Sequence, residues 1–280
     1  MPGMYKGIIY IFVLFLLVNC STKKQLDNGK IKVTVSIVTY ADFVKNIGGD
    51  KVEINTMIPL NSNPHDYEPI PTQITELAKS SIYFKIGTNF TFEQILLEKI
   101  KNIKNNIKIV DCSKGINIVN NNPHVWLGID ESKIICQNIF NLLKEFSPKD
   151  SIYFRNNLIT YLAKIDSAEK ELKVDFEKLT NKYMLVYHPA WSYFTKHYGL
   201  TEIGIEREGK EPNALDLKNV INFAKANKIR VIYVEPQFDK EVATSIAEEL
   251  KAKIEVINPI PIDFLKNLNE LHSKIFNSNK

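Results

Sequence analysis

Residues 31–58 read IKVTVSIVTYADFVKNIGGDKVEINTMI, and this stretch decides the fold. It starts with a run rich in β-branched residues, continues as the helix-like YADFVKNIGG, and returns to a second β-branched run, KVEINTMI. A further helix pattern, PTQITELAKS (71–80), and a further strand pattern, SIYFKIG (81–87), follow. Short strands that alternate with helices are typical of βαβ units, so the sequence predicts a mostly parallel sheet.

The second half of the chain repeats this alternation of strand and helix patterns. The segments are YMLVY (183–187), WSYFTKHYG (191–199), LDLKNVINFAKAN (215–227), IRVIYV (229–234), KEVATSIAEEL (240–250) and KIEVIN (253–258). We therefore predict an α/β protein with two doubly wound lobes.

A long helix is predicted between the two halves, because residues 149–188 contain no glycine or proline. Apolar residues recur there at spacings of three, four and seven, on one face of a helix. They are Leu158, Leu162, Ile165, Leu172, Phe176 and Leu179. We predict a linking helix over residues 150–181, between an N-terminal lobe (31–149) and a C-terminal lobe (182–280). Such a helix bends little, so we expect no large hinge closure.

The N-terminus has the pattern of an export signal. Residues 8–18 are apolar and uncharged, too short a run for a bilayer, which needs about 20 such residues. We predict a signal peptide over residues 1–20 and a polar tether over residues 21–30. The motif LVNCS resembles the lipobox of bacterial lipoproteins and implies that Cys20 is the lipid anchor, although Asn19 departs from the small residue usual there. The alternative is an uncleaved signal anchor.

Composition indicates a globular protein, with 44% hydrophobic and 24% charged residues. The formal net charge is only +4, and arginine is rare beside lysine. This balance argues against nucleic-acid binding, which relies on arginine for base edges. We expect a monomer without a nucleic-acid partner. Beyond Cys20, the only thiols are Cys112 and Cys136, which either pair or remain free.

Three of the five histidines share a local setting. His65 lies in NSNPHDYEP, His124 in NNNPHVWL and His188 in LVYHPAWSYF, each beside a proline and in a predicted loop. Loops at the carboxyl ends of parallel strands can converge from distant parts of the sequence. Three imidazoles plus one more donor complete a tetrahedral zinc shell. His197 and His272 lack this setting and are predicted to be surface residues.

A family resemblance covers nearly the whole chain after the tether. The motifs NPHDYEP, PHVWL, YHPAWSYFTKHYGL, EREGKEPNALDL and YVEPQFDKE resemble, in order, those of the zinc/manganese solute-binding proteins of ABC transporters. The resemblance implies a non-enzymatic, exported protein that captures a divalent metal ion between two lobes and delivers it to a permease and its ATPase. It also places the metal ligands at His65, His124 and His188.

The fourth ligand position departs from the family pattern. Where the family has an aspartate before a proline, this chain has Asn258 in KIEVINP. Asn258, water or Glu235 could supply the fourth donor, and an Asn-Pro turn would explain Asn258 without any ligand role. A shell rich in nitrogen favours zinc over manganese, which prefers oxygen. Because only neutral imidazole coordinates a metal ion, metal affinity should fall as the pH drops through the histidine range near about 6.5.

Two other functions compete with metal transport. A zinc-dependent hydrolase could also use three histidines and an open position, but the chain has no HExxH, GxSxG or GxxxxGK[ST] motif. A surface adhesin lipoprotein is a further alternative that the sequence does not separate from transport.

Overall fold

The computed structural model describes residues 29–88, 90–101, 107–206, 212–238 and 241–279. The predicted signal peptide (1–20), its Cys20 and most of the predicted tether lie outside the described residues. Within the described part of the chain, no helix combines the length and apolarity needed to cross a membrane.

The N-terminal lobe is built on a four-stranded parallel sheet in the order β2-β1-β3-β4. Its strands are β1 (Ile31–Val35), β2 (Val52–Thr56), β3 (Ile82–Lys85) and β4 (Lys108–Asp111), and its helices are α1 (Val38–Gly48), α2 (Pro71–Ala78) and α3 (Thr91–Lys101). β1 is buried along most of its length, as expected for a central parallel strand.

The C-terminal lobe repeats the same plan with the order β6-β5-β7-β8, again all parallel. The elements are β5 (Tyr183–Val186), α6 (Ser192–His197), β6 (Thr201–Gly204), α7 (Ala214–Ala226), β7 (Val231–Val234), α8 (Glu241–Leu250) and β8 (Lys253–Val256). The two parallel sheets with their helices confirm the predicted fold class of two doubly wound α/β lobes. The segment patterns above did not include β4 and β6, which lie at one edge of each sheet.

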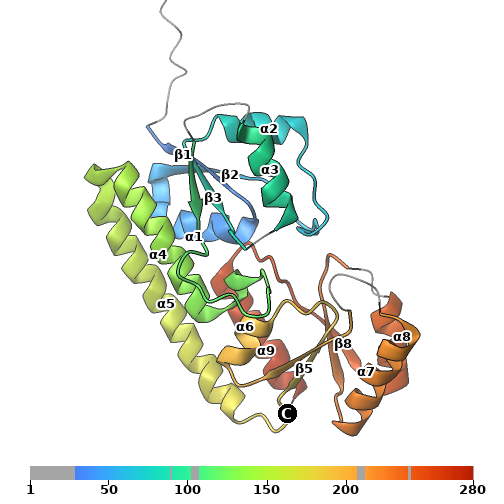
Figure 1. Cartoon of the computed structure of the whole chain (residues 1–280). Helices are drawn as coiled ribbons and strands as arrows, with labels where there is room; N and C mark the ends of the chain where they lie inside the picture. The colour runs from blue at the N-terminus through green and yellow to red at the C-terminus, as the bar shows by residue number, and fades with distance from the viewer. Residues whose placement is uncertain (1–28, 89, 102–106, 207–211, 239–240, 280) are drawn as a thin grey trace, which may run out of the picture.

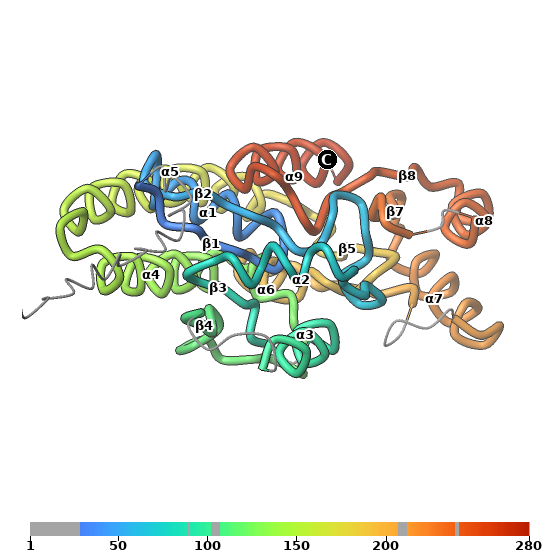
Figure 2. Tube along the Cα trace, turned by 90° about the horizontal axis from the view of Figure 1, so that it is seen from above, coloured from blue at the N-terminus to red at the C-terminus, as the bar shows by residue number. Residues whose placement is uncertain are grey.

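Three helices tie the lobes together: α4 (Ile129–Phe146), α5 (Ser151–Glu177) and α9 (Phe264–Ser278). α5 is the predicted long helix, and its 27 residues span about 40 Å at 1.5 Å per residue. It runs antiparallel to α4 down one side of both lobes (Figure 1). α9 lies beside α5 along the back of the molecule (Figure 2) and also contacts α1. The end of the predicted C-terminal lobe (182–280) therefore packs against the other lobe. Short 3-10 helices are η1 (Gly49–Lys51), η2 (Val125–Leu127) and η3 (Pro148–Asp150).

A continuous apolar core crosses the junction between the lobes. One cluster of buried side chains runs from the N-terminal sheet through α4 and α5 to α6 and α9, and a second fills the space among β5, β7, α7 and α8. Polar contacts also cross the junction: Trp126 Nε1 donates to the carbonyl of Pro259 at 2.6 Å, and Asp42 accepts from the Phe264 N–H at 3.0 Å. A close-packed interior resists deformation, and the absence of a large hinge stays a prediction.

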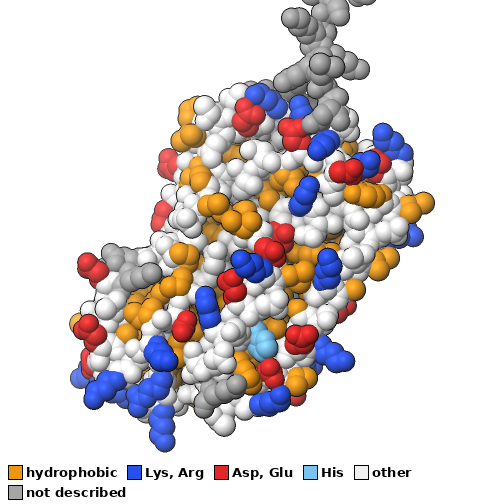
Figure 3. Space-filling view, turned by 180° about the vertical axis from the view of Figure 1, so that it is seen from behind, with side chains coloured by type: hydrophobic (Ala, Val, Ile, Leu, Met, Phe, Trp, Pro, Cys, Tyr) orange, Lys and Arg blue, Asp and Glu red, His pale blue; other side chains and the backbone are white. Residues whose placement is uncertain are grey.

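Both internal cysteines are buried free thiols, so the open question about Cys112 and Cys136 is answered against a disulfide. Burial raises the pKa of both thiols and keeps them protonated. On the surface, lysine and arginine side chains are interspersed with acidic ones across the back face (Figure 3).

Candidate metal site

His65, His124 and His188 meet at one point between the lobes, although 123 positions separate the first from the last. His124 Nε2 lies 3.0 Å from His65 Nε2 and 3.2 Å from His188 Nε2. All three candidate ligand atoms lie within 4.8 Å of one another, and the described residues contain no other group of three such His, Cys, Asp or Glu side chains.

The two N-terminal histidines are held by the same local turn. His65 follows Asn63 and Pro64 in the segment after β2, and His124 follows Asn122 and Pro123 in the segment after β4. In each turn the asparagine Oδ1 accepts the backbone N–H of the histidine, at 3.0 Å for His65 and 2.9 Å for His124. Asparagine bonds the backbone two residues ahead in this way, and proline fixes the φ angle between them.

His188 is positioned differently, by residues that follow other strands of the C-terminal lobe. It comes directly after β5 and Tyr187, and its Nδ1 is hydrogen bonded to the buried carboxylate of Glu206, after β6. Phe238, after β7, stacks on its ring with a centroid distance of 4.8 Å and an interplanar angle of 23°. The ring is therefore held at its edge by a carboxylate and on its face by an aromatic side chain.

Hydrogen bonding fixes the tautomers of two of the three rings. Asn122 Nδ2 donates to Ser192 Oγ at 2.7 Å, so the Oδ1 of Asn122 faces the Nδ1 of His124 at 2.7 Å and must accept its proton. The Glu206 carboxylate likewise accepts the Nδ1–H of His188. In the neutral rings, the Nε2 lone pairs of His124 and His188 then face each other at 3.2 Å. Such an arrangement is repulsive alone and is suited to holding a cation.

Burial keeps the N-terminal pair of histidines neutral. Loss of solvent lowers the pKa of His65 to about 4, with a further lowering from His188. The same desolvation lowers the pKa of His124 well below its usual value. Neutral imidazole is the form that binds metal ions. The rings are therefore available for coordination at neutral pH without first losing a proton.

The space at the three histidines is small and mostly apolar. Its volume of about 10 Å³ is roughly the room for one water-sized sphere. Besides the histidines, the lining residues are Asn63, Pro64, Trp126, Gln237, Phe238, Pro259 and Ile260. No carboxylate is among them. A cavity of this size and lining suits a single ion more than an organic ligand.

Asn258, the predicted fourth ligand, does not line this cavity. Its Oδ1 accepts the backbone N–H of Ile260 at 2.9 Å. Residues 258–260 thus form a third Asn-Pro turn of the kind that presents His65 and His124, but the residue it presents to the cavity is Ile260. A ligand role for Asn258 stays a prediction.

Glu235, the other candidate donor, is fully buried behind His188. Its carboxyl group accepts the backbone N–H of His188 at 3.3 Å and the Nε1–H of Trp191 at 3.1 Å. Burial raises the pKa of Glu235 to about 8, so the group is largely protonated at neutral pH. These contacts make it a support for the His188 loop.

Sequence reasoning missed the residues that orient the histidine rings. Asn122 carried a detectable signal, since it begins the second of two Asn-Pro-His triplets. Glu206 begins the quoted motif EREGKEPNALDL, but nothing in the sequence shows that it meets His188. The remaining histidines lie outside the cavity and are partly buried: His197 contacts Asp130 and Glu169, and His272 contacts Asp175. The prediction that His197 and His272 are surface residues was only partly right.

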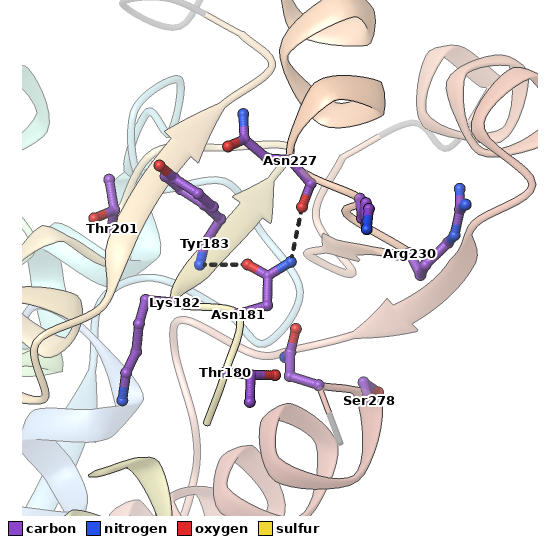
Figure 4. Close-up of a pocket in the computed structure, with 10 residues that line it drawn as sticks. Thr180, Asn181, Lys182, Tyr183, Thr201, Asn227, Arg230 and Ser278 are labelled. Atoms are coloured by element: carbon purple, nitrogen blue, oxygen red, sulfur yellow. Dashed lines mark hydrogen bonds between the residues drawn. The ribbon is translucent and has the colours of Figure 1, made fainter. Parts of the chain in front are cut away.

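A much larger hollow, of about 690 Å³, lies at the other end of the C-terminal sheet, where its strands begin. Asn181 bridges the Asn227 carbonyl and the Tyr183 N–H there (Figure 4). The labelled cations Lys182 and Arg230 point away from each other (Figure 4). Lys182 Nζ donates to the Phe176 carbonyl at the end of α5, and Arg230 donates to the Leu250 carbonyl at 3.0 Å. Lys182 and Arg230 therefore both bind carbonyl groups at helix ends, and they do not converge on a ligand in the hollow.

Comparisons with known proteins identify the family of this chain. The family described as zinc-uptake complex component A, periplasmic, matches residues 33–274. The high-affinity zinc uptake system protein ZnuA of Bacillus subtilis strain 168 is 27% identical over 283 residues, covering 91% of this chain and 88% of that protein. The manganese ABC transporter substrate-binding lipoprotein PsaA of Streptococcus mitis is 26% identical over 269 residues, covering 88% and 86%.

Solved structures share the same two-lobed architecture. A crystal structure of ZnuA superposes with a TM-score of 0.86 at 35% identity, covering 90% of this chain and 100% of that one. The laminin-binding protein of Streptococcus agalactiae, described as a bifunctional adhesin and metal transporter, gives a TM-score of 0.82 at 20% identity, covering 89% and 100%. At that identity the likeness concerns the fold alone.

Proposed function

Because this chain belongs to the family of the periplasmic component A of zinc-uptake complexes, we propose that it binds Zn²⁺ through His65, His124 and His188. The chain captures a divalent transition metal for import by an ABC transporter, as its relatives do. Zinc as the ion, and these three histidines as its ligands, are the finer parts of the proposal. The ion is the transported substrate.

One observation carries the ligand assignment: the facing Nε2 atoms of His124 and His188 at 3.2 Å. Both rings give their Nδ1 protons to oxygen acceptors, which leaves two lone pairs aimed at the same point. A divalent cation converts this repulsion into two bonds. Hydrogen-bonded imidazoles are also better metal ligands, because the acceptor raises the basicity of the ring.

The nitrogen-rich donor set supports zinc over manganese. Zinc accepts imidazole readily in a tetrahedral shell, whereas manganese prefers oxygen donors. No carboxylate among the described residues lines the cavity. The same lining disfavours the alternative of a zinc hydrolase, since a general base must reach the metal-bound water. The relatives named above are substrate-binding proteins of transporters, not enzymes.

Capture and release follow from the position of the ligands. His65 and His124 belong to the N-terminal lobe and His188 to the C-terminal lobe, so the ion would bridge the two. The apolar side chains of Trp126, Phe238 and Ile260 would exclude water from it. Release then requires the permease to separate His188 from the other pair. The shared core at the junction makes local loop movement the expected route.

Metal analysis of the purified protein tests this function. We expect about one zinc per chain and, in a competition titration, zinc to displace manganese even when manganese is in large excess. Preferential retention of manganese would refute the zinc assignment, and the absence of any tight divalent metal would refute the site.

We also propose that the chain is exported as a monomer and tethered to the membrane through Cys20. The relatives' names as lipoproteins support this location. A Cys20→Ser variant should move from the membrane fraction to the soluble extracytoplasmic fraction while keeping its zinc. Unchanged membrane association in that variant would contradict the lipid anchor.

A further inference from the structure

Gln237 lines the same cavity as the three histidines and has an unusual side-chain oxygen. Its Oε1 is buried and has no hydrogen-bond partner among the described residues. A buried acceptor without a partner costs about 1–3 kcal/mol, so buried polar atoms are rarely left in this state. Its presence in the wall of a metal cavity calls for a physical reason.

The orientation of the Gln237 amide is fixed by Asn258. Gln237 Nε2 lies 3.4 Å from Asn258 Oδ1, and that oxygen already accepts the Ile260 N–H. An oxygen that accepts a backbone N–H attracts the NH₂ of Gln237 and repels its oxygen. Turning the amide over would bring two acceptors together. Asn258 therefore keeps Gln237 Oε1 turned away from itself.

The other side-chain amide in the cavity wall, Asn63, already uses its Oδ1 to accept the His65 N–H. The third Asn-Pro turn presents the apolar Ile260 where the other two present histidines. The carboxyl groups of Glu206 and Glu235 are committed to His188 and Trp191. Phe238, the neighbour of Gln237, stacks on His188, so the backbone that carries Gln237 is tied to one of the proposed ligands.

From these observations we propose that Gln237 Oε1 is the fourth protein donor to the bound ion, with Asn258 as the residue that aims it. The inference rests on the proposed three-histidine site. The shell then contains three imidazole nitrogens and one amide oxygen, two donors from each lobe, all neutral. Such a shell contributes no charged ligand of its own, and an ion in it is held less firmly than one with a carboxylate ligand.

Replacement of Gln237 by leucine tests this role. Leucine has a similar size but no donor or acceptor. The control is Gln137→Leu on α4, far from the cavity, where Gln137 Nε2 donates to Asn141 Oδ1 at 3.0 Å. We expect Gln237→Leu to weaken zinc binding at least about 10-fold and to change the visible absorption spectrum of bound Co²⁺. Gln137→Leu should change neither. Gln237→Glu, which offers a charged oxygen, should bind zinc more tightly and gain affinity for manganese.

The stability of the metal-free protein separates a ligand role from a structural one. If Gln237 is a donor, Gln237→Leu should leave the Tm of the metal-free protein unchanged or raised, because an unsatisfied oxygen is removed. An unaltered Co²⁺ spectrum in Gln237→Leu would overturn the proposal, whether or not the affinity falls. Failure of the proposed function is a different result: wild-type protein without tight zinc, or His124→Ala with undiminished zinc affinity.

Discussion

The two lobes share one strand order, yet they present their histidines by different means. In the N-terminal lobe, His65 and His124 sit on loops shaped by Asn-Pro turns, whose acceptors are neutral amide oxygens. In the C-terminal lobe, His188 follows a strand directly and is held by the carboxylate of Glu206. The same fold can therefore aim a ring by loop geometry or by an ionic partner.

This difference indicates that the two lobes contribute different properties to the site. The turns fix where the N-terminal backbone places its rings, and burial keeps those rings neutral. The C-terminal lobe adds a buried negative charge that favours a cation nearby. The following predictions test how far the two lobes differ, in order of decreasing effect.

Removal of the central ring should have the largest effect. His124 lies closest to both other histidines, so His124→Ala should weaken zinc binding more than about 100-fold, beyond the cost of losing a residue that only orients a ligand. The far-ultraviolet circular dichroism spectrum should remain that of the wild type. His272→Ala, on α9, is the control and should bind zinc normally. Undiminished zinc binding by His124→Ala, measured by competition titration, would end the three-histidine assignment.

Loss of the ionic support in the C-terminal lobe should rank second. Glu206→Gln keeps an oxygen for the His188 Nδ1–H but removes the charge, and we expect zinc affinity to fall about 10-fold to 100-fold. Glu202→Gln is a matched control, because Glu202 is also largely buried but accepts from the Trp191 N–H at 2.7 Å and supports no ring. Equal effects of the two substitutions would mean that the charge on Glu206 has no special role.

The neutral support in the N-terminal lobe should matter less. Asn122→Ala removes the acceptor for both the backbone N–H and the ring Nδ1–H of His124, so zinc affinity should fall about 10-fold. Asn63→Ala removes the backbone acceptor for His65 and a hydrogen bond to Asp66, but no partner of the His65 ring, and should cost less. If Asn63→Ala were the more damaging of the pair, turn geometry would outweigh orientation of the ring.

A pH effect on the metal-free protein should be the smallest. The pKa of His65 is about 4 in the folded chain and about 6.5 when unfolded. Between these values the unfolded state binds the extra proton, so stability falls as the pH drops below about 6.5. For this group the loss between pH 7 and pH 5.5 is about 1 kcal/mol.

Comparison with His65→Gln isolates this contribution, because Glu202 and Glu235 have raised pKa values and act in the opposite direction. The difference in the free energy of unfolding between wild type and variant should shift by about 1 kcal/mol over that range. A constant difference would show that His65 titrates normally. With a pKa of about 4, His65 takes up a proton in competition with the metal ion near pH 4. The sequence alone led us to expect this competition near pH 6.5.

The sequence alone was enough to predict two parallel α/β lobes and the long helix, because the strand and helix patterns and the segment without glycine or proline are local properties. The order of the motifs was enough to select the three histidines. Periodicity reports which face of an element is buried, and proline and asparagine report turns. These signals extend over a few residues and can be read without knowing which distant residues the segment contacts.

Contacts between distant segments were decided only by the tertiary structure. Glu206 supports His188 because β6 lies next to β5, and Gln237 meets Asn258 because β7 lies next to β8. Burial of His65 and Glu235 moves their pKa values in opposite directions, which no local pattern indicates. Asn258 was one of three candidates for the fourth donor in the sequence, and only the folded chain shows that its oxygen accepts the Ile260 N–H. The identity of a donor depends on where its lone pair points, and that direction exists only once the chain has folded.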